Sequence, residues 1–105
     1  PKRSGLPGGC VFMSASAELD DKPGPARDRL VAFERDFLDL TANMVSAAIK
    51  EGHFHEGVDP AQFAFEFYGI MVSGHRSYRL LRDPEATART RRAFEDLVLR
   101  SRKTS

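Results

Sequence analysis

Apolar residues of this 105-residue chain recur at intervals of three and four after residue 20, which is the spacing of amphipathic helices. One such stripe predicts a helix over residues 25–51. Pro25 suits the first turn of a helix, and Gly52 suits the residue just past its end. The apolar positions of this stripe are Leu30, Phe33, Phe37, Leu40, Met44, Ala47 and Ala48.

The clearest helix start in the sequence precedes residues 60–82. Asp59 can cap this helix, Pro60 fits its first turn, and Gln62 stands three residues after the cap, as in a capping box. Most of the circumference of this helix is apolar, so it has to be covered on more than one side. Its two adjacent stripes are Phe63, Phe67, Ile70, Met71, Gly74, Tyr78 and Leu81, and Ala64, Phe65, Tyr68, Val72 and His75.

Two further segments complete an all-α prediction. Asp83 and Pro84 predict the start of a helix that ends near Arg100. Residues 10–19 alternate like a half-buried strand, but Ala, Met, Glu and Leu favour a helix. With residues 1–9 as a Pro/Gly/Ser-rich linker and residues 101–105 as a frayed tail, we expect a bundle of four main helices.

Composition places the chain among globular proteins, at 41% hydrophobic and 30% charged residues. No apolar run approaches the length of a membrane span, so no membrane partner is expected. A single cysteine, Cys10, excludes an internal disulfide and favours a reducing compartment such as the cytoplasm.

Charge is distributed unevenly, with a net −4 over residues 1–75 and +5 over residues 76–105. A basic end could indicate nucleic-acid binding. Opposite charges four residues apart instead favour a solvated helix face. The pairs are Glu85–Arg89, Arg91–Glu95, Arg92–Asp96 and Asp96–Arg100.

His53, His55 and Glu56 are residue types that bind metals, but zinc sites normally need three or four ligands. We therefore predict a solvated turn without a metal, and a small metal-dependent enzyme using this loop is the weaker alternative. No nucleophile elbow, phosphate-binding loop or dinucleotide fingerprint occurs. The chain is accordingly expected to be neither an enzyme nor a cofactor-binding protein.

A set of aromatic and Met residues fits either ordinary core packing or an apolar pocket between helices. In a pocket, His75 or Tyr78 would fix the orientation of a ligand. A two-fold homodimer would cover the surplus apolar surface of residues 60–82 with one self-complementary patch. The pocket candidates are Phe12, Met13, Phe33, Phe37, Met44, Phe67, Met71 and Tyr78. The interface candidates are Tyr68, Val72, His75, Phe94, Leu97 and Val98.

Five stretches, taken in order, resemble the C-terminal regulatory domain of TetR-family bacterial transcriptional repressors. They are PGGCVF (7–12), ELDDKPGPARD (18–28), EGH (51–53), VDPAQFAFE (58–66) and LLRDP (80–84). The resemblance implies that residues 10–19 are helical and that the last two helices form a four-helix dimer interface with their symmetry mates. It also implies a pocket for a small inducer among the first three helices.

The family's N-terminal helix-turn-helix unit is too long for residues 1–9. We therefore expect a domain, over residues 10–100, that dimerises and binds a mostly apolar effector. DNA would be contacted only through an N-terminal domain absent from this chain. A purely structural helical dimerisation module without a ligand is the alternative.

Overall fold

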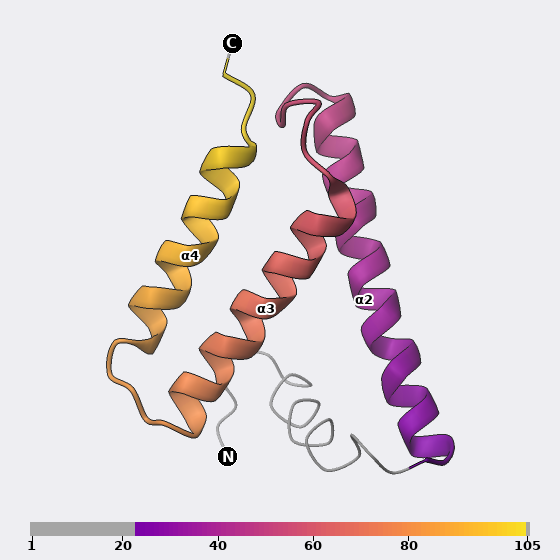
Figure 1. Cartoon of the computed structure of the whole chain (residues 1–105), viewed down its shortest axis with the longest axis vertical. Helices are drawn as coiled ribbons and strands as arrows, with labels where there is room; N and C mark the ends of the chain where they lie inside the picture. The colour runs from indigo at the N-terminus through magenta and orange to yellow at the C-terminus, as the bar shows by residue number, and fades with distance from the viewer. Residues whose placement is uncertain (1–22, 105) are drawn as a thin grey trace. The chain divides into compact units, whose positions relative to one another are not determined.

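The computed structural model describes residues 23–104, which contain three α-helices (Figure 1). They are α2, Pro25–Lys50, α3, Pro60–Arg79, and α4, Ala86–Ser101. These residues form no strand beyond one isolated bridge, so the all-α class is confirmed for them. The expected linker over residues 1–9 and helix over residues 10–19 lie outside the described residues. No helix between residues 23 and 104 has the length and hydropathy to cross a bilayer.

The chain divides into two compact units, Pro1–Phe37 and Leu38–Ser105. The described part of the first unit is the start of α2, where the Asp28 amide donates to the Gly24 carbonyl at 3.0 Å. Gly24 has a φ of 135°, which only glycine adopts readily, so it can set the chain direction just before Pro25. The second unit contains the end of α2 together with α3 and α4, and it holds the core described next.

The core of the second unit takes one large side chain from each helix. Val45 of α2, Phe63 of α3 and Leu97 of α4 are all buried, and Leu97 is only 1% exposed. Leu97 was expected at a dimer interface. That expectation is wrong, because its side chain is already covered within one chain. Partly buried residues around this cluster are Ile49, Phe54, Val58, Phe67, Ile70 and Val98.

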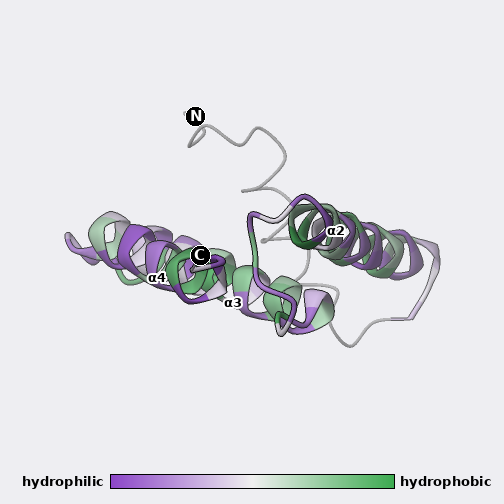
Figure 2. Cartoon of the chain, turned by 90° about the horizontal axis from the view of Figure 1, so that it is seen from above, coloured by the Kyte–Doolittle hydropathy of each residue, from purple (hydrophilic) through white to green (hydrophobic). Residues whose placement is uncertain are grey.

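The buried side of α2 differs from the stripe expected for it. Val45 is buried and Ile49 packs on the core, whereas Leu40 is 60% and Met44 65% exposed. Successive residues of a helix point about 100° apart. The face that carries Val45 is therefore different from the face that carries Met44. Apolar residues occur on both faces of α2, which is visible as mixed colouring of the helix in Figure 2, so periodicity alone did not identify Val45 as the buried position. The half-buried residues of the expected stripe are Leu30, Phe37 and Ala48.

The start of α3 is capped as expected. The Asp59 carboxylate accepts hydrogen bonds from the amides of Ala61 at 3.0 Å and Gln62 at 3.4 Å. The Gln62 side chain instead donates to Glu66 at 2.9 Å, one turn further on, so it does not complete the expected capping box. The helix ends at Arg79, three residues before the expected Arg82. Arg82 has a φ of 54°, in the left-handed region that ends a right-handed helix.

The end of α4 is ordered further than expected. Ser101 is the last helical residue, it is buried, and its hydroxyl donates to the Leu97 carbonyl at 2.7 Å. Beyond it, Arg102 forms a bridge with Phe54, and the Lys103 amide donates to the His53 carbonyl at 2.9 Å. The prediction of a frayed tail that begins at residue 101 is therefore wrong for residues 101–103. The loop between α2 and α3 forms backbone contacts with this segment and holds it in place.

Candidate functional site

The helices α3 and α4 pack side by side (Figure 1), and Gly74 of α3 lies directly against Thr90 of α4. A Cβ atom at position 74 would overlap the side chain of Thr90. The Thr90 hydroxyl is held in place, because it donates to the Ala86 carbonyl at 2.7 Å. Glycine at position 74 is thus required by this contact, and the two helices leave a groove along one side of it.

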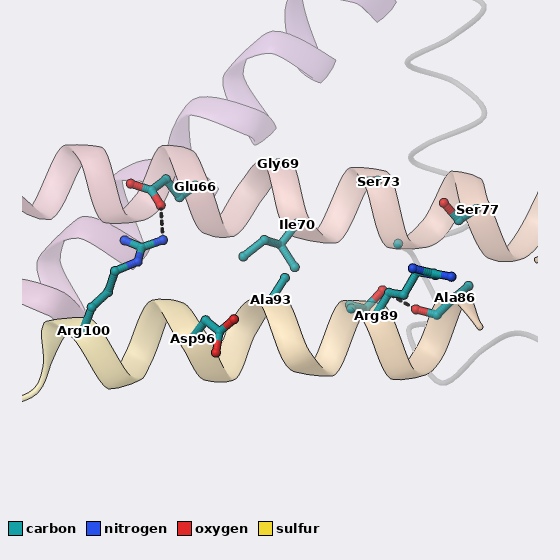
Figure 3. A pocket seen from close by; sticks show the side chains of 12 residues that line it. Glu66, Gly69, Ile70, Ser73, Ser77, Ala86, Arg89, Ala93, Asp96 and Arg100 are labelled. Atoms are coloured by element: carbon teal, nitrogen blue, oxygen red, sulfur yellow. Dashed lines mark hydrogen bonds and ion pairs between the residues drawn. The ribbon is translucent and has the colours of Figure 1, made fainter.

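The groove between α3 and α4 has a cavity volume of about 630 Å³. Most of its lining side chains are small, and both helices contribute to it (Figure 3). Gly69, Ser73 and Asp96 are exposed, so the groove is open to solvent. The residues from α3 are Glu66, Gly69, Ile70, Ser73, Gly74 and Ser77, and those from α4 are Ala86, Arg89, Thr90, Ala93, Asp96 and Arg100.

An ion pair joins the two helices at one end of the groove. Arg100 Nη2 lies 2.8 Å from Glu66 Oε1 (Figure 3). Gln62 donates to the other oxygen of the same carboxylate at 2.9 Å. The hydrogen bonds from Gln62 and Arg100 lower the pKa of Glu66 below its ordinary value. Glu66 is therefore held as a carboxylate bridge between α3 and α4.

The arginines of the groove pair differently from the four-residue spacing expected within α4. Arg100 contacts Glu66 on α3 rather than Asp96, and Arg89 Nε lies 3.8 Å from Asp83 Oδ2 rather than beside Glu85. Long flexible side chains choose among several nearby acids, and exposed pairs differ little in energy. The basic residues of α4 consequently contribute to the groove and not only to a solvated face.

The expected pocket residues lie elsewhere. None of the six that the structure describes lines the groove. Phe67 packs against the core and against the ring of Phe94, with centroids 5.4 Å apart. Phe37 and Met71 are half-buried, while Phe33, Met44 and Tyr78 are exposed by 56%, 65% and 54%. Phe12 and Met13 lie outside the described residues, so the pocket stays a prediction.

The expected interface residues also lie away from the groove. Val98 packs on the core, and Tyr68, Val72 and His75 are half-buried along α3. Burial lowers the pKa of His75, and the nearby charges of Arg79 and Arg76 lower it further. The expected interface residues therefore lie on a different surface from the groove between α3 and α4.

The sequence does contain a pattern that indicates the groove, namely small residues at regular steps along α3 and α4. The apolar stripes expected for residues 60–82 do not include Gly69, Ser73 or Ser77. Gly69, Ser73 and Ser77 follow one line along α3, and Ala86 and Ala93 stand seven residues apart on α4. Gly, Ser and Ala contribute little to either a hydrophobic pattern or a charge pattern, so they predict neither a core nor a charged surface. Their common face emerges only when α4 is placed beside α3.

His55 connects the loop between α2 and α3 to the end of α4. The Gly57 amide donates to Nδ1 of His55 at 3.1 Å, so Nδ1 accepts and Nε2 is the nitrogen that can donate. Nε2 then donates to the Arg100 carbonyl at 3.1 Å. Both ring nitrogens are occupied within the protein, which leaves neither for a metal.

His53 gives no support to the alternative of a metal-dependent enzyme that uses this loop. Its Nε2 lies 3.6 Å from Glu51, and both side chains are about 70% exposed, at 72% and 69%. Among residues 23–104, no three His, Cys, Asp or Glu side chains are placed to hold a metal ion. The loop acts instead as a structural connection.

Comparison with known proteins gives one family match. Residues 1–94 match a family model described as "Tetracyclin repressor-like, C-terminal domain". The match includes α2, α3 and the part of α4 up to Phe94. No curated protein and no solved structure matches the chain significantly.

Proposed function

Because the chain belongs to the family of tetracyclin repressor-like C-terminal domains, we propose that it is the effector-sensing and homodimerisation domain of a TetR-like repressor. The family itself makes it a regulatory domain of a TetR-type regulator. Effector binding would be passed to a DNA-binding domain, and a cytoplasmic location follows from that role. Dimerisation and effector binding would use different sides of α3 and α4.

The groove supports the dimerisation half of this proposal. It is open, and its small residues, such as Gly69, Ser73 and Ala93, would let a second pair of helices approach closely. A two-fold axis presents the same groove from both copies, so one self-complementary surface is sufficient. The groove is the observation that carries the proposed dimer.

A different side of α3 supports the effector-binding half. Phe67, Met71 and Tyr78 each follow a groove-lining residue by one position, which is about 100° around the helix. They therefore share a line along α3 that the groove does not use. Tyr78 is 54% exposed, and Phe94 beside Phe67 is 39% exposed. An apolar molecule could cover these surfaces, with the Tyr78 hydroxyl as a polar contact.

Dimerisation is tested by the mass in solution of a variant that fills the groove. We expect a dimer for the unsubstituted chain at micromolar concentration, and a monomer for Ser73→Arg with an unchanged circular dichroism spectrum. Ala88→Arg is the matched control, because Ala88 is exposed on α4 and does not line the groove. A monomeric unsubstituted chain, or a dimeric Ser73→Arg variant, would refute the proposed interface.

Effector binding is tested by thermal shift against a panel of apolar metabolites. A ligand at 100 times its dissociation constant adds about 2.7 kcal/mol of stability. We expect Tyr78→Ala to abolish the shift and to keep the dimer, whereas Leu99→Ala, on the exposed side of α4, leaves the shift unchanged. If no apolar compound shifts the transition, a purely structural dimerisation module becomes the better description.

A further inference from the structure

The two ends of the groove carry opposite charges that the chain itself leaves weakly paired. Arg89 and Asp96 are seven residues apart, so they stand two turns apart on one side of α4. The Arg89 side chain is 73% exposed, and its contact with Asp83 is long, at 3.8 Å. Asp96 is exposed and forms no ion pair with any residue between 23 and 104. By contrast, Glu66 and Arg100 already satisfy each other at 2.8 Å.

From this distribution we infer the orientation of the proposed dimer, an inference that rests on the proposed function. A second copy docks in the groove with α4 antiparallel to its mate, and the two-fold axis crosses the groove near Ala93. Arg89 of each copy then pairs with the partner subunit's Asp96. One two-fold axis produces two identical ion pairs, and the small residues between them form the closest contact.

The other orientation is disfavoured by charge. A two-fold axis running along the helices would place α4 against the mate of α3 at the same level. Asp96 would then lie near the partner subunit's Glu66, whose charge is already paired with Arg100 at 2.8 Å. Neither Arg89 nor Asp96 would therefore gain an opposite charge. The antiparallel arrangement instead gives each of them an oppositely charged partner.

These ion pairs select the orientation of the dimer and contribute little to its strength. Exposed pairs are worth about 0–1 kcal/mol each, whereas like charges in the same places repel. Arg89 and Asp96 therefore act as specificity-determining residues. Close packing around Gly69, Ser73 and Ala93 would supply most of the affinity.

Charge reversal in two separate variants tests the orientation. Arg89→Asp carries an acid at both ends of the groove, and Asp96→Arg carries a base at both ends. Each variant alone would bring like charges together twice per dimer, so its dissociation constant should rise about tenfold or more in sedimentation experiments. When the two variants are mixed, both contacts become attractive, and native mass spectrometry should show a heterodimer. Both reversals in one chain should restore the homodimer.

Arg91→Asp and Glu95→Arg are the matched controls. They make the same changes in net charge at exposed positions of α4 outside the groove, and they should dimerise like the unsubstituted chain. If the unsubstituted chain is a dimer but the groove variants dimerise equally well, or form no heterodimer, the orientation is wrong and the proposed dimer stands. If the unsubstituted chain is a monomer, both proposals fail.

Discussion

The rings of Phe67 on α3 and Phe94 on α4 lie with their centroids 5.4 Å apart and their planes inclined by 52°. Tilted pairs at this separation are favourable, because the edge of one ring meets the face of the other. The sequence pattern had placed Phe67 in a ligand pocket and Phe94 in a dimer interface. Their contact means that both residues belong to one surface of the α3–α4 pair.

Removing either ring should destabilise the fold, and the two effects should be coupled. We expect Phe67→Ala to cost about 2–3 kcal/mol, and Phe94→Ala to cost less because Phe94 is 39% exposed. A double-mutant cycle by urea denaturation at fixed protein concentration should give a coupling of about 0.5–1.5 kcal/mol. Phe65→Ala, at a 69% exposed position, should change stability by less than about 0.5 kcal/mol. Strict additivity of the ring deletions would contradict the contact.

Gly74 should not tolerate even one added methyl group. A Cβ at this position overlaps the Thr90 side chain, so Gly74→Ala should destabilise the chain by about 1–3 kcal/mol despite the better helix propensity of alanine. Gly69→Ala is the control at a protein concentration where the chain is monomeric, because Gly69 lines the proposed interface and no atom of its own chain lies within 4 Å of the added Cβ. There, helix propensity should raise stability by up to about 1 kcal/mol in thermal unfolding.

A rescue variant separates overlap from any other effect at position 74. Thr90→Ala removes the hydroxyl and methyl groups that meet the added Cβ. In the Thr90→Ala background, the Gly74→Ala substitution should therefore cost much less than it does alone. An equal cost in both backgrounds would show that the two helices are not in contact here.

His55 and His53 should differ sharply although they are two residues apart. His55→Ala leaves the Arg100 carbonyl and the Gly57 amide without their ring partner, and we expect a loss of about 1–2 kcal/mol. His53→Ala removes only an exposed contact with Glu51 at 3.6 Å and should change stability by less than about 0.5 kcal/mol. Chemical denaturation of both variants measures the difference. Similar values would mean that the His55 ring does not hold the end of α4.

The Glu66 carboxylate should make the fold less stable in acid. Its pKa in the folded chain is below the ordinary value of 4.5, chiefly through the hydrogen bonds from Gln62 and Arg100. As the pH falls below about 4.5, the unfolded chain takes up the proton first, and the stabilisation is lost as the pH passes through the folded pKa. Because Arg100 is 60% exposed, the effect should be at most about 1 kcal/mol.

Glu66→Gln tests this pH dependence directly. The amide cannot titrate, so the part of the stability slope that lies below pH 4.5 should shrink in urea titrations at several pH values. The variant should also be slightly less stable at neutral pH, since the charge of Arg100 loses its partner. An unchanged slope below pH 4.5 would show that the carboxylate bridge between α3 and α4 contributes nothing.

Local signals in the sequence were sufficient for the helices themselves. Pro25, Asp59 and the apolar periodicity predicted α2 and the start of α3 almost to the residue, since caps and prolines act within a single turn. The family was recognisable for a related reason, because the order and spacing of short stretches survive in the sequence. α4 begins two residues after Pro84, which shows the usual limit of such signals at helix ends.

Which face of each helix is buried was decided only by tertiary packing. Val45 lies inside while Met44 lies outside, and Leu97 entered the core rather than an interface, because neighbouring apolar positions are equivalent until another helix covers one of them. The groove has the same origin: Gly69, Ser73 and Ala93 carry no strong signal along the chain, and they line one surface only where Gly74 lets α4 lie against α3. The sequence by itself therefore determined the elements and the family. The burial of each face, the contact between Phe67 and Phe94 and the candidate site were set by contacts between residues far apart in the chain.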